Sequence, residues 1–278
     1  MPRRQRRLPR GWYPEDPDSL RSLVQGWLGR DLSAAAGRGS SIAAVAPHAG
    51  WAFSGRLAAL AAASLGPAQT IAVFGGHLPP RARPLAASES GFDTPLGPLE
   101  ADRELLGVLE LSLGLGRDEE SDNTVEVLLP LVAALFPGAR VLWLRAPNDE
   151  SSIGLGQALF AASVSVGRRV ACLGSTDLTH YGPNYGFSPK GLGPVAESWV
   201  RERNDARFLE AILGLDGPEA LRRAESERSA CSPGAAVASL AFALSAGATR
   251  AALLEYATSL DARRDESFVG YAAIAFQK

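Results

Sequence analysis

Short apolar runs alternate with segments of helical periodicity through most of the chain, and this alternation limits the folds that the chain can adopt. The runs that we predict as strands are residues 41–46, 70–74, 140–145, 169–173, 250–258 and 268–276. Strands that alternate with helices predict a mostly parallel sheet with helices on both faces. Neither a linker nor a convincing internal repeat divides the 278 residues. We therefore expect a single α/β domain over residues 1–278.

The three histidines of the chain share one place in this pattern. His48, His77 and His180 each come soon after a short apolar run, where a predicted strand has ended. In an open α/β sheet, ligands bind outside the carboxyl ends of the strands. Parallel strands would therefore bring the three imidazoles to one edge of the sheet. The alternative is three unrelated polar residues in loops, and their common placement favours the shared edge.

The composition and the missing motifs exclude several classes of function. A net charge of −2 gives no reason to expect nucleic acid as a partner, and we expect residues 1–10, which hold five arginines, to form a flexible, solvated basic terminus. No apolar stretch resembles a membrane span or a secretory signal. Two cysteines do not make a disulfide framework, so we expect a cytoplasmic protein. The absence of a GxGxxG fingerprint, a P-loop and a nucleophile elbow argues against dinucleotide enzymes, NTPases and serine hydrolases.

Two histidines and a thiolate or carboxylate can hold a transition metal and leave coordination positions open. His48 and His77 are the first candidates for such ligands. Cys231 is the candidate third ligand, because it precedes a helix that we predict to begin at Ser232-Pro233. The dipole and the free N–H groups at the start of a helix favour the thiolate. The alternative for Cys231 is a small buried hydrophobic residue.

A carboxylate and an imidazole form a second candidate group. Asp177 and His180 are three residues apart, so on a helical turn they would share a face. The carboxylate could then orient the imidazole for acid/base catalysis, or the pair could be a capping Asp and a solvated His. Glu126 is an alternative metal ligand or proton carrier, or simply a partner of a helix dipole. Cys172 lies inside an apolar run and should belong to the core.

Short motifs that contain these residues together resemble the Memo family, whose prokaryotic members are described as protein B of the AmmeMemoRadiSam system. The motifs run in family order over nearly the whole chain, and the ordered set is more specific than any one of them. They are Gly11-Trp12-Tyr13-Pro14, Pro47-His48-Ala49-Gly50-Trp51 with Ser54-Gly55, Gly75-Gly76-His77, Thr94-Pro95-Leu96-Gly97, Val125-Glu126 with Leu129-Pro130, Ser175-Thr176-Asp177-Leu178-Thr179-His180-Tyr181-Gly182, and Val269-Gly270-Tyr271-Ala272.

The resemblance implies a fold and a metal site. The Memo family is similar in fold to class III extradiol dioxygenases, which hold iron(II) with two histidines and a glutamate. In Memo-like proteins a cysteine replaces the carboxylate, and iron or copper binding has been described. By position, the resemblance implies His48, His77 and Cys231 as metal ligands. It also implies Asp177 and His180 as a supporting or acid/base pair.

One stretch departs from the family pattern. Family members usually read Glu-His-Ser before the Val/Ile-Glu pair, and here the same stretch reads Asp122-Asn123-Thr124. A neutral amide therefore replaces an imidazole at Asn123. A role of that histidine in substrate contact or proton transfer does not carry over to this chain.

Three functions are compatible with these residues. The first is an oxygenase-type enzyme that uses non-haem iron(II), or copper, to activate O₂ on a small or peptide-borne substrate. The second is a non-catalytic metal- or peptide-binding adaptor with an enzyme-like cleft. The third is zinc-dependent hydrolysis, which the same ligands permit. We expect iron(II) before copper(I) or zinc, and the resemblance implies AMMECR-like and radical SAM proteins as partners.

Overall fold

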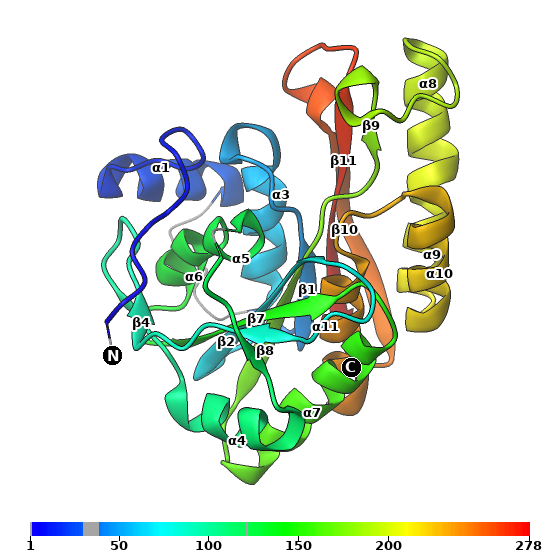
Figure 1. Cartoon of the computed structure of the whole chain (residues 1–278). Coiled ribbons are helices and arrows are strands. Elements are labelled where there is room, and N and C mark those ends of the chain that lie inside the picture. Colours follow the sequence, from blue (N-terminus) through cyan, green and yellow to red (C-terminus); the bar gives the residue numbers. More distant parts are fainter. Residues whose placement is uncertain (1, 30–38, 121) are drawn as a thin grey trace.

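One mixed sheet runs through the centre of the computed structural model, which describes residues 2–29, 39–120 and 122–278 (Figure 1). Its strands are β1 (Ala43–Ala46), β2 (Thr70–Leu78), β3 (Leu85–Ala86), β6 (Gly116–Arg117), β7 (Arg140–Pro147), β8 (Val170–Ser175), β9 (His180–Tyr181), β10 (Arg250–Thr258) and β11 (Phe268–Gln277). They follow the order β10-β11-β1-β8-β2-β7-β3-β6, and β9 pairs with β11. The central strands β1, β8, β2 and β7 are parallel, whereas β11 pairs antiparallel with β1 and with β10.

Helices cover both faces of this sheet. One face carries α1 (Pro17–Leu28), α3 (Trp51–Ser64), α5 (Asn123–Glu126) and α6 (Leu129–Leu135). The other carries α4 (Arg103–Leu113), α7 (Ser151–Ser165), α9 (Asp205–Leu213), α10 (Gly217–Glu227) and α11 (Pro233–Ser245). Shorter segments are α8 (Pro194–Trp199), the π-helical turn η2 (Val200–Asn204), and the 3₁₀ turns η1 (Pro183–Tyr185) and η3 (Ser259–Asp261). The predicted single α/β domain is confirmed, and none of the described helices is long and apolar enough to cross a membrane.

Small residues at the centre of the sheet bring the covering helices close to it. β1 reads Ala-Ala-Val-Ala, and alternate residues belong to the cores on its two faces. Strands buried on both faces read as continuous apolar runs, as this one does. A Cβ on Gly174 in β8 would lie 2.5 Å from the carbonyl oxygen of Ala235 in α11. This close approach holds the first turn of α11, and Cys231 just before it, at the edge of the sheet.

Two segments between β2 and β7 need a separate description. Residues 123–135 form the two helices α5 and α6, and Pro130 lies in the first turn of α6. Proline is tolerated there because the first N–H groups of a helix have no partner inside the helix. β3 pairs with β7 in the main sheet. A two-stranded hairpin is made by β4 (Gly91–Phe92) and β5 (Leu99–Glu100).

The basic N-terminus, which we expected to be flexible and solvated, packs against the domain. Arg4 is buried, and its guanidinium donates to Glu89 Oε1 at 2.9 Å. The backbone N–H groups of Arg7 and Leu8 donate to Glu126 Oε1 at 3.0 and 2.9 Å. A run of arginines does not reveal acidic partners that lie far along the chain. The segment is therefore attached at Arg4 and Leu8, while most of its other side chains are exposed to solvent.

Candidate metal centre

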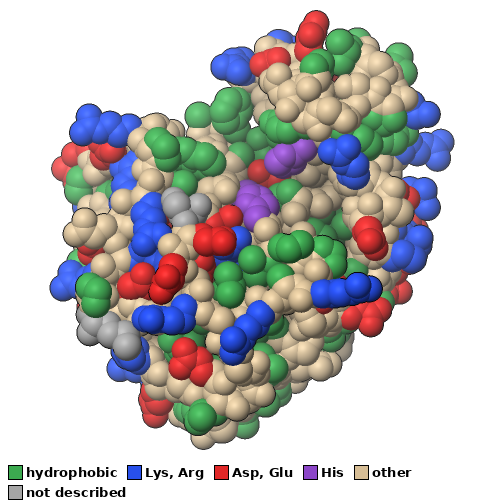
Figure 2. Space-filling model, in the orientation of Figure 1, with side chains coloured by type: hydrophobic (Ala, Val, Ile, Leu, Met, Phe, Trp, Pro, Cys, Tyr) green, Lys and Arg blue, Asp and Glu red, His purple; other side chains and the backbone are tan. Residues whose placement is uncertain are grey.

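The carboxyl ends of β1, β2 and β8 meet at one edge of the sheet, and the three histidines lie there. His48 follows β1, His77 is the last but one residue of β2, and His180 begins β9 soon after β8. Cys231 reaches the same place from the segment before α11. The donor atoms of His48, His77 and Cys231 all lie within 4.8 Å of one another. Figure 2 shows histidine side chains in the hollow on this face, so the structure brings the three predicted ligands together with His180 beside them.

His48 is fixed on several sides, and only 2% of its surface is exposed. Its Nδ1 lies 3.0 Å from Ser175 Oγ, on the neighbouring strand β8. Its Nε2 lies 3.3 Å from Cys231 Sγ. The backbone N–H of His48 donates to Asp177 Oδ1 at 2.7 Å. These contacts hold the imidazole with Nε2 toward the thiol.

His77 has a left-handed backbone conformation, with φ 58°, that is uncommon for residues other than glycine. The two residues before it must be glycines, because neighbouring atoms leave no room for a Cβ. A Cβ on Gly75 would lie 2.3 Å from Thr124 Oγ1, and a Cβ on Gly76 would lie 2.2 Å from Ser232 Cβ. Strained conformations of this kind cluster at functional sites. The Gly-Gly-His motif therefore brings the end of β2 into direct contact with the start of α11.

Cys231 has the environment of a reactive thiol, and Cys172 does not. Burial alone would raise the pKa of the Cys231 thiol, but the charge of His48 and the neighbouring imidazoles of His180 and His77 hold it well below its usual value. The thiolate is the form that binds metals. Cys172 lies in β8 and is fully buried, so burial raises the pKa of its thiol well above the usual value. Its predicted place in the core is confirmed.

Asp177 and His180 lie side by side, although no helical turn joins them. Asp177 Oδ2 is 3.9 Å from the Nε2 atoms of both His180 and His48. Burial raises the pKa of the Asp177 carboxyl, against the opposing charge of His48. The pKa of His180 is also raised, because the nearby Cys231 and Asp177 outweigh a burial that alone would lower it. The pairing of β9 with β11, and not a helix, brings the two side chains together.

The donor set fits a transition metal of borderline softness. Bonds of about 2.0–2.3 Å join such ions to imidazole nitrogen and thiolate sulfur, so the close spacing of the three donors suits a single ion. Calcium and magnesium would require mainly oxygen ligands. In addition, the Nε2 of His180 is buried and has no hydrogen-bond partner among the described residues. A bound ion and its remaining ligands would give this nitrogen a partner.

Two residues weighed from the sequence have other contacts. The carboxylate of Glu126 accepts from two backbone N–H groups of the N-terminal segment and from Tyr13 Oη at 3.1 Å. Glu126 is therefore fully engaged in holding that segment, and the alternative of a Glu126 ligand is wrong. Asn123 lines the cleft beside the histidines, and its Nδ2 donates to the carbonyl oxygen of His48 at 3.0 Å. No pattern in the sequence indicates this support of the loop after β1.

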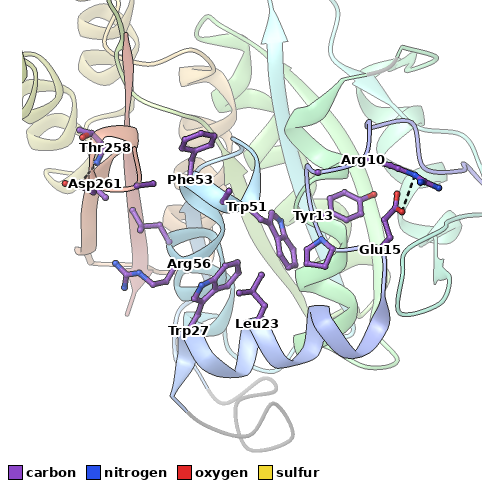
Figure 3. A pocket seen from close by; sticks show the side chains of 16 residues that line it. Arg10, Tyr13, Glu15, Leu23, Trp27, Trp51, Phe53, Arg56, Thr258 and Asp261 are labelled. Carbon is purple, nitrogen blue, oxygen red and sulfur yellow. Dashed lines mark hydrogen bonds and ion pairs between the residues drawn. The ribbon is translucent and has the colours of Figure 1, made fainter. Parts of the chain in front are cut away.

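A cleft of about 680 Å³ opens at the histidines, and Phe53, Tyr185 and Tyr271 are among its walls. A second cavity of about 790 Å³ shares the lining residues Arg10, Gly11 and Phe53 with this cleft. Figure 3 shows this second cavity, where aromatic rings from α1, α3 and the N-terminal segment lie close together. Phe53 therefore forms a wall of both spaces.

The chain is similar to a known protein family and to several of its members. The family model described as Memo-like protein matches residues 4–275. A MEMO1 family protein of Methanococcoides burtonii is 32% identical over 95% of this chain and 96% of its own length. A MEMO1 family protein of Methanosarcina barkeri is 34% identical with the same coverage, and one of Thermococcus onnurineus is 30% identical over 96% of this chain and 97% of its own length.

A solved structure supports the fold. The crystal structure of an uncharacterized protein from Escherichia coli K12 superposes with a TM-score of 0.52 and covers 84% of this chain and 98% of that chain. At 14% identity this likeness concerns the fold alone. The family match, in contrast, spans every motif that contributes to the cleft. The chain belongs to the Memo-like protein family.

Proposed function

We propose that the protein binds a transition metal through His48, His77 and Cys231 and acts as an oxygenase-type enzyme on a small or peptide-borne substrate. The observation that carries this proposal is the group of three donor atoms within 4.8 Å, one of which is a thiol with a lowered pKa. Imidazole and thiolate ligands suit iron(II), copper(I) and zinc, and we propose iron(II) first. When bound, iron or copper would supply redox chemistry beside the substrate.

His180 and Asp177 would handle protons next to this centre. The Nε2 of His180 has no hydrogen bond within the described residues, so it could take a proton from a reacting group or give one. Asp177, 3.9 Å away, stabilises the protonated ring. Its other oxygen holds the backbone N–H of His48. We therefore assign the pair to proton transfer and to positioning, and not to metal ligation.

Variants that remove one histidine each test this assignment. His48→Ala should lose most of the metal, whereas His180→Ala should keep a metal content near that of the wild type but consume less O₂. The measurements are elemental analysis of protein purified without oxygen, and O₂ uptake by the iron(II)-loaded protein. If His180→Ala loses as much metal as His48→Ala, the assignment of His180 is wrong.

A metal- or peptide-binding adaptor without turnover is the second candidate. The observation that favours it is Asn123, which cannot carry a proton at a place in the cleft where family members usually have histidine. The two cavities that share Phe53 as a wall also offer room for a peptide. Iron(II)-loaded protein that binds peptides but consumes no O₂ with any of them would support the adaptor.

The cellular setting is part of the same proposal. Cys172 and Cys231 are both free thiols, which supports a reducing, cytoplasmic location. AMMECR-like and radical SAM proteins are the proposed partners. Sedimentation of purified mixtures would test these partners, because a complex sediments faster than its components.

A further inference from the structure

We propose that Asp122 is a positioning residue that fixes the ring of His77 so that its Nε2 is free for a metal. The inference rests on the proposed metal site. Asp122 Oδ2 lies 3.0 Å from His77 Nδ1. A carboxylate can only accept, so the neutral imidazole, which is the form that binds a metal, keeps its proton on Nδ1 and its lone pair on Nε2. Carboxylates that hold ligating histidines in this way set both ring orientation and affinity.

Asp122 is itself held from two sides. Its Oδ1 accepts from the backbone N–H of Thr124 at 2.9 Å and from Thr124 Oγ1, as expected for the residue that caps α5. On the other side, Arg145 Nη2 lies 3.6 Å from Asp122 Oδ2. The side chain of Arg145 is only 3% exposed, and its Nε donates to the carbonyl oxygen of Gly76 at 2.9 Å. The carboxylate and the peptide before His77 are therefore attached to the same buried guanidinium.

The strained backbone of His77 is held by the same neighbours. The N–H of Gly76 donates to Thr124 Oγ1 at 3.0 Å, and the N–H of His77 donates to Ser232 Oγ at 3.2 Å. Ser232 directly follows Cys231, so the peptide of one proposed ligand is bonded to the neighbour of another. Protein contacts therefore determine where the His77 ring lies before any ion binds. The left-handed backbone of His77 is energetically unfavourable, and these surrounding contacts stabilise it in the arrangement of the proposed site.

The isosteric variant Asp122→Asn separates this role from packing. The two donors of Thr124 keep the amide oxygen in the place of Oδ1, so the amide NH₂ takes the place of Oδ2 and faces His77. It would donate to Nδ1, and the neutral ring would then carry its proton on Nε2, the nitrogen that the metal needs. Asparagine also caps helices well, so α5 should remain intact.

The matched control is Glu120→Gln. Glu120 Oε2 lies 2.6 Å from Arg145 Nη1, so this carboxylate shares the guanidinium with Asp122, but its side chain is mostly exposed and is not bonded to His77. Zinc affinity is measured on the full-length protein by competition with a coloured chelator. We expect Asp122→Asn to bind zinc about 10–100-fold more weakly than the wild type. Glu120→Gln should stay within about twofold, and an equally small change in Asp122→Asn would overturn the proposal.

Nitrogen NMR of the metal-free protein at pH 8 tests the ring directly. The chain has three histidines, so their ring nitrogens can be assigned by single substitutions. We expect a proton on His77 Nδ1 in the wild type and none in Asp122→Asn. If the Nδ1 proton differs in this way between the two proteins but the wild type binds no zinc, the positioning role is supported and the proposed function is refuted. Zinc binding by a wild type whose Nδ1 carries no proton would refute the positioning and leave the function standing.

Discussion

At the scale of single residues, the surroundings of a side chain decide its chemistry. Cys172 and Cys231 are the same residue type, yet one lies in the middle of β8 and the other among three imidazoles. Burial in apolar surroundings favours the neutral thiol, whereas nearby positive charge favours the thiolate. Thiol-directed reagents should therefore react mainly with Cys231.

Alkylation followed by mass spectrometry measures this difference. Iodoacetamide should modify Cys231 at least about tenfold faster than Cys172 in metal-free protein, because the thiolate is the reacting species. Loading with zinc should slow the reaction at Cys231 and leave Cys172 unchanged. Cys231→Ser should bind zinc at least tenfold more weakly, because a hydroxyl does not ionise at neutral pH. Equal rates at Cys231 with and without zinc would mean that its sulfur is not a ligand.

The residues of the candidate site could be predicted from the sequence, but most of their supports could not. His48, His77 and Cys231 lie at the ends of predicted elements, and the periodicity of those elements is local. Arg145 bonds the carbonyl oxygen of Gly76 from 69 residues away, and Ser232 bonds the N–H of His77 from 155 residues away, across pairings that no local pattern encodes. Contacts between distant segments depend on strand order, and alternation of strands and helices does not fix that order.

At the scale of elements, one buried carboxylate is among the groups that attach the N-terminal segment to the domain. Glu126 accepts from the backbone of Arg7 and Leu8 and from Tyr13, and it is nearly fully buried. The segment continues into Gly11, which lines both cavities. The position of Glu126 near a helix start suggested a partner of the helix dipole. In the structure it instead holds the N-terminal segment, which lines part of the cleft.

Removal of this carboxylate should loosen the segment around Arg7 and Leu8. Glu126→Ala leaves three donors without an acceptor, so we expect a loss of about 1–3 kcal/mol in the free energy of unfolding. Trypsin should then cleave after Arg7 faster than in the wild type, because the segment can leave the surface. Glu126→Gln is the milder control, since its amide oxygen can still accept from Leu8 and Tyr13. Unchanged cleavage in Glu126→Ala would show that other contacts hold the segment.

At the scale of the whole molecule, a buried carboxyl connects the helix layer with the site. Asp205, at the start of α9, accepts from the backbone N–H of Thr179 at 3.0 Å and from Tyr256 Oη, in β10, at 2.7 Å. Thr179 directly precedes His180. A Cβ on Gly270 would lie 2.0 Å from Asp205 Oδ2, so the carboxyl is enclosed tightly. Burial raises the pKa of Asp205 to about 6, although its hydrogen bonds act in the opposite direction.

This raised pKa predicts a stability that falls as pH rises. Between the unfolded value of 3.8 and the folded value of about 6, the native protein holds a proton that the unfolded chain has lost. The stabilisation from this group is therefore complete below about pH 4 and is lost as pH rises to about 6. Asp205→Asn cannot ionise and keeps an acceptor for Thr179. Relative to the wild type, the metal-free variant should gain stability steadily between pH 4 and 7 in urea titrations, by an amount on the order of 3 kcal/mol at most. A stability difference that does not change with pH would place the folded pKa of Asp205 at its ordinary value.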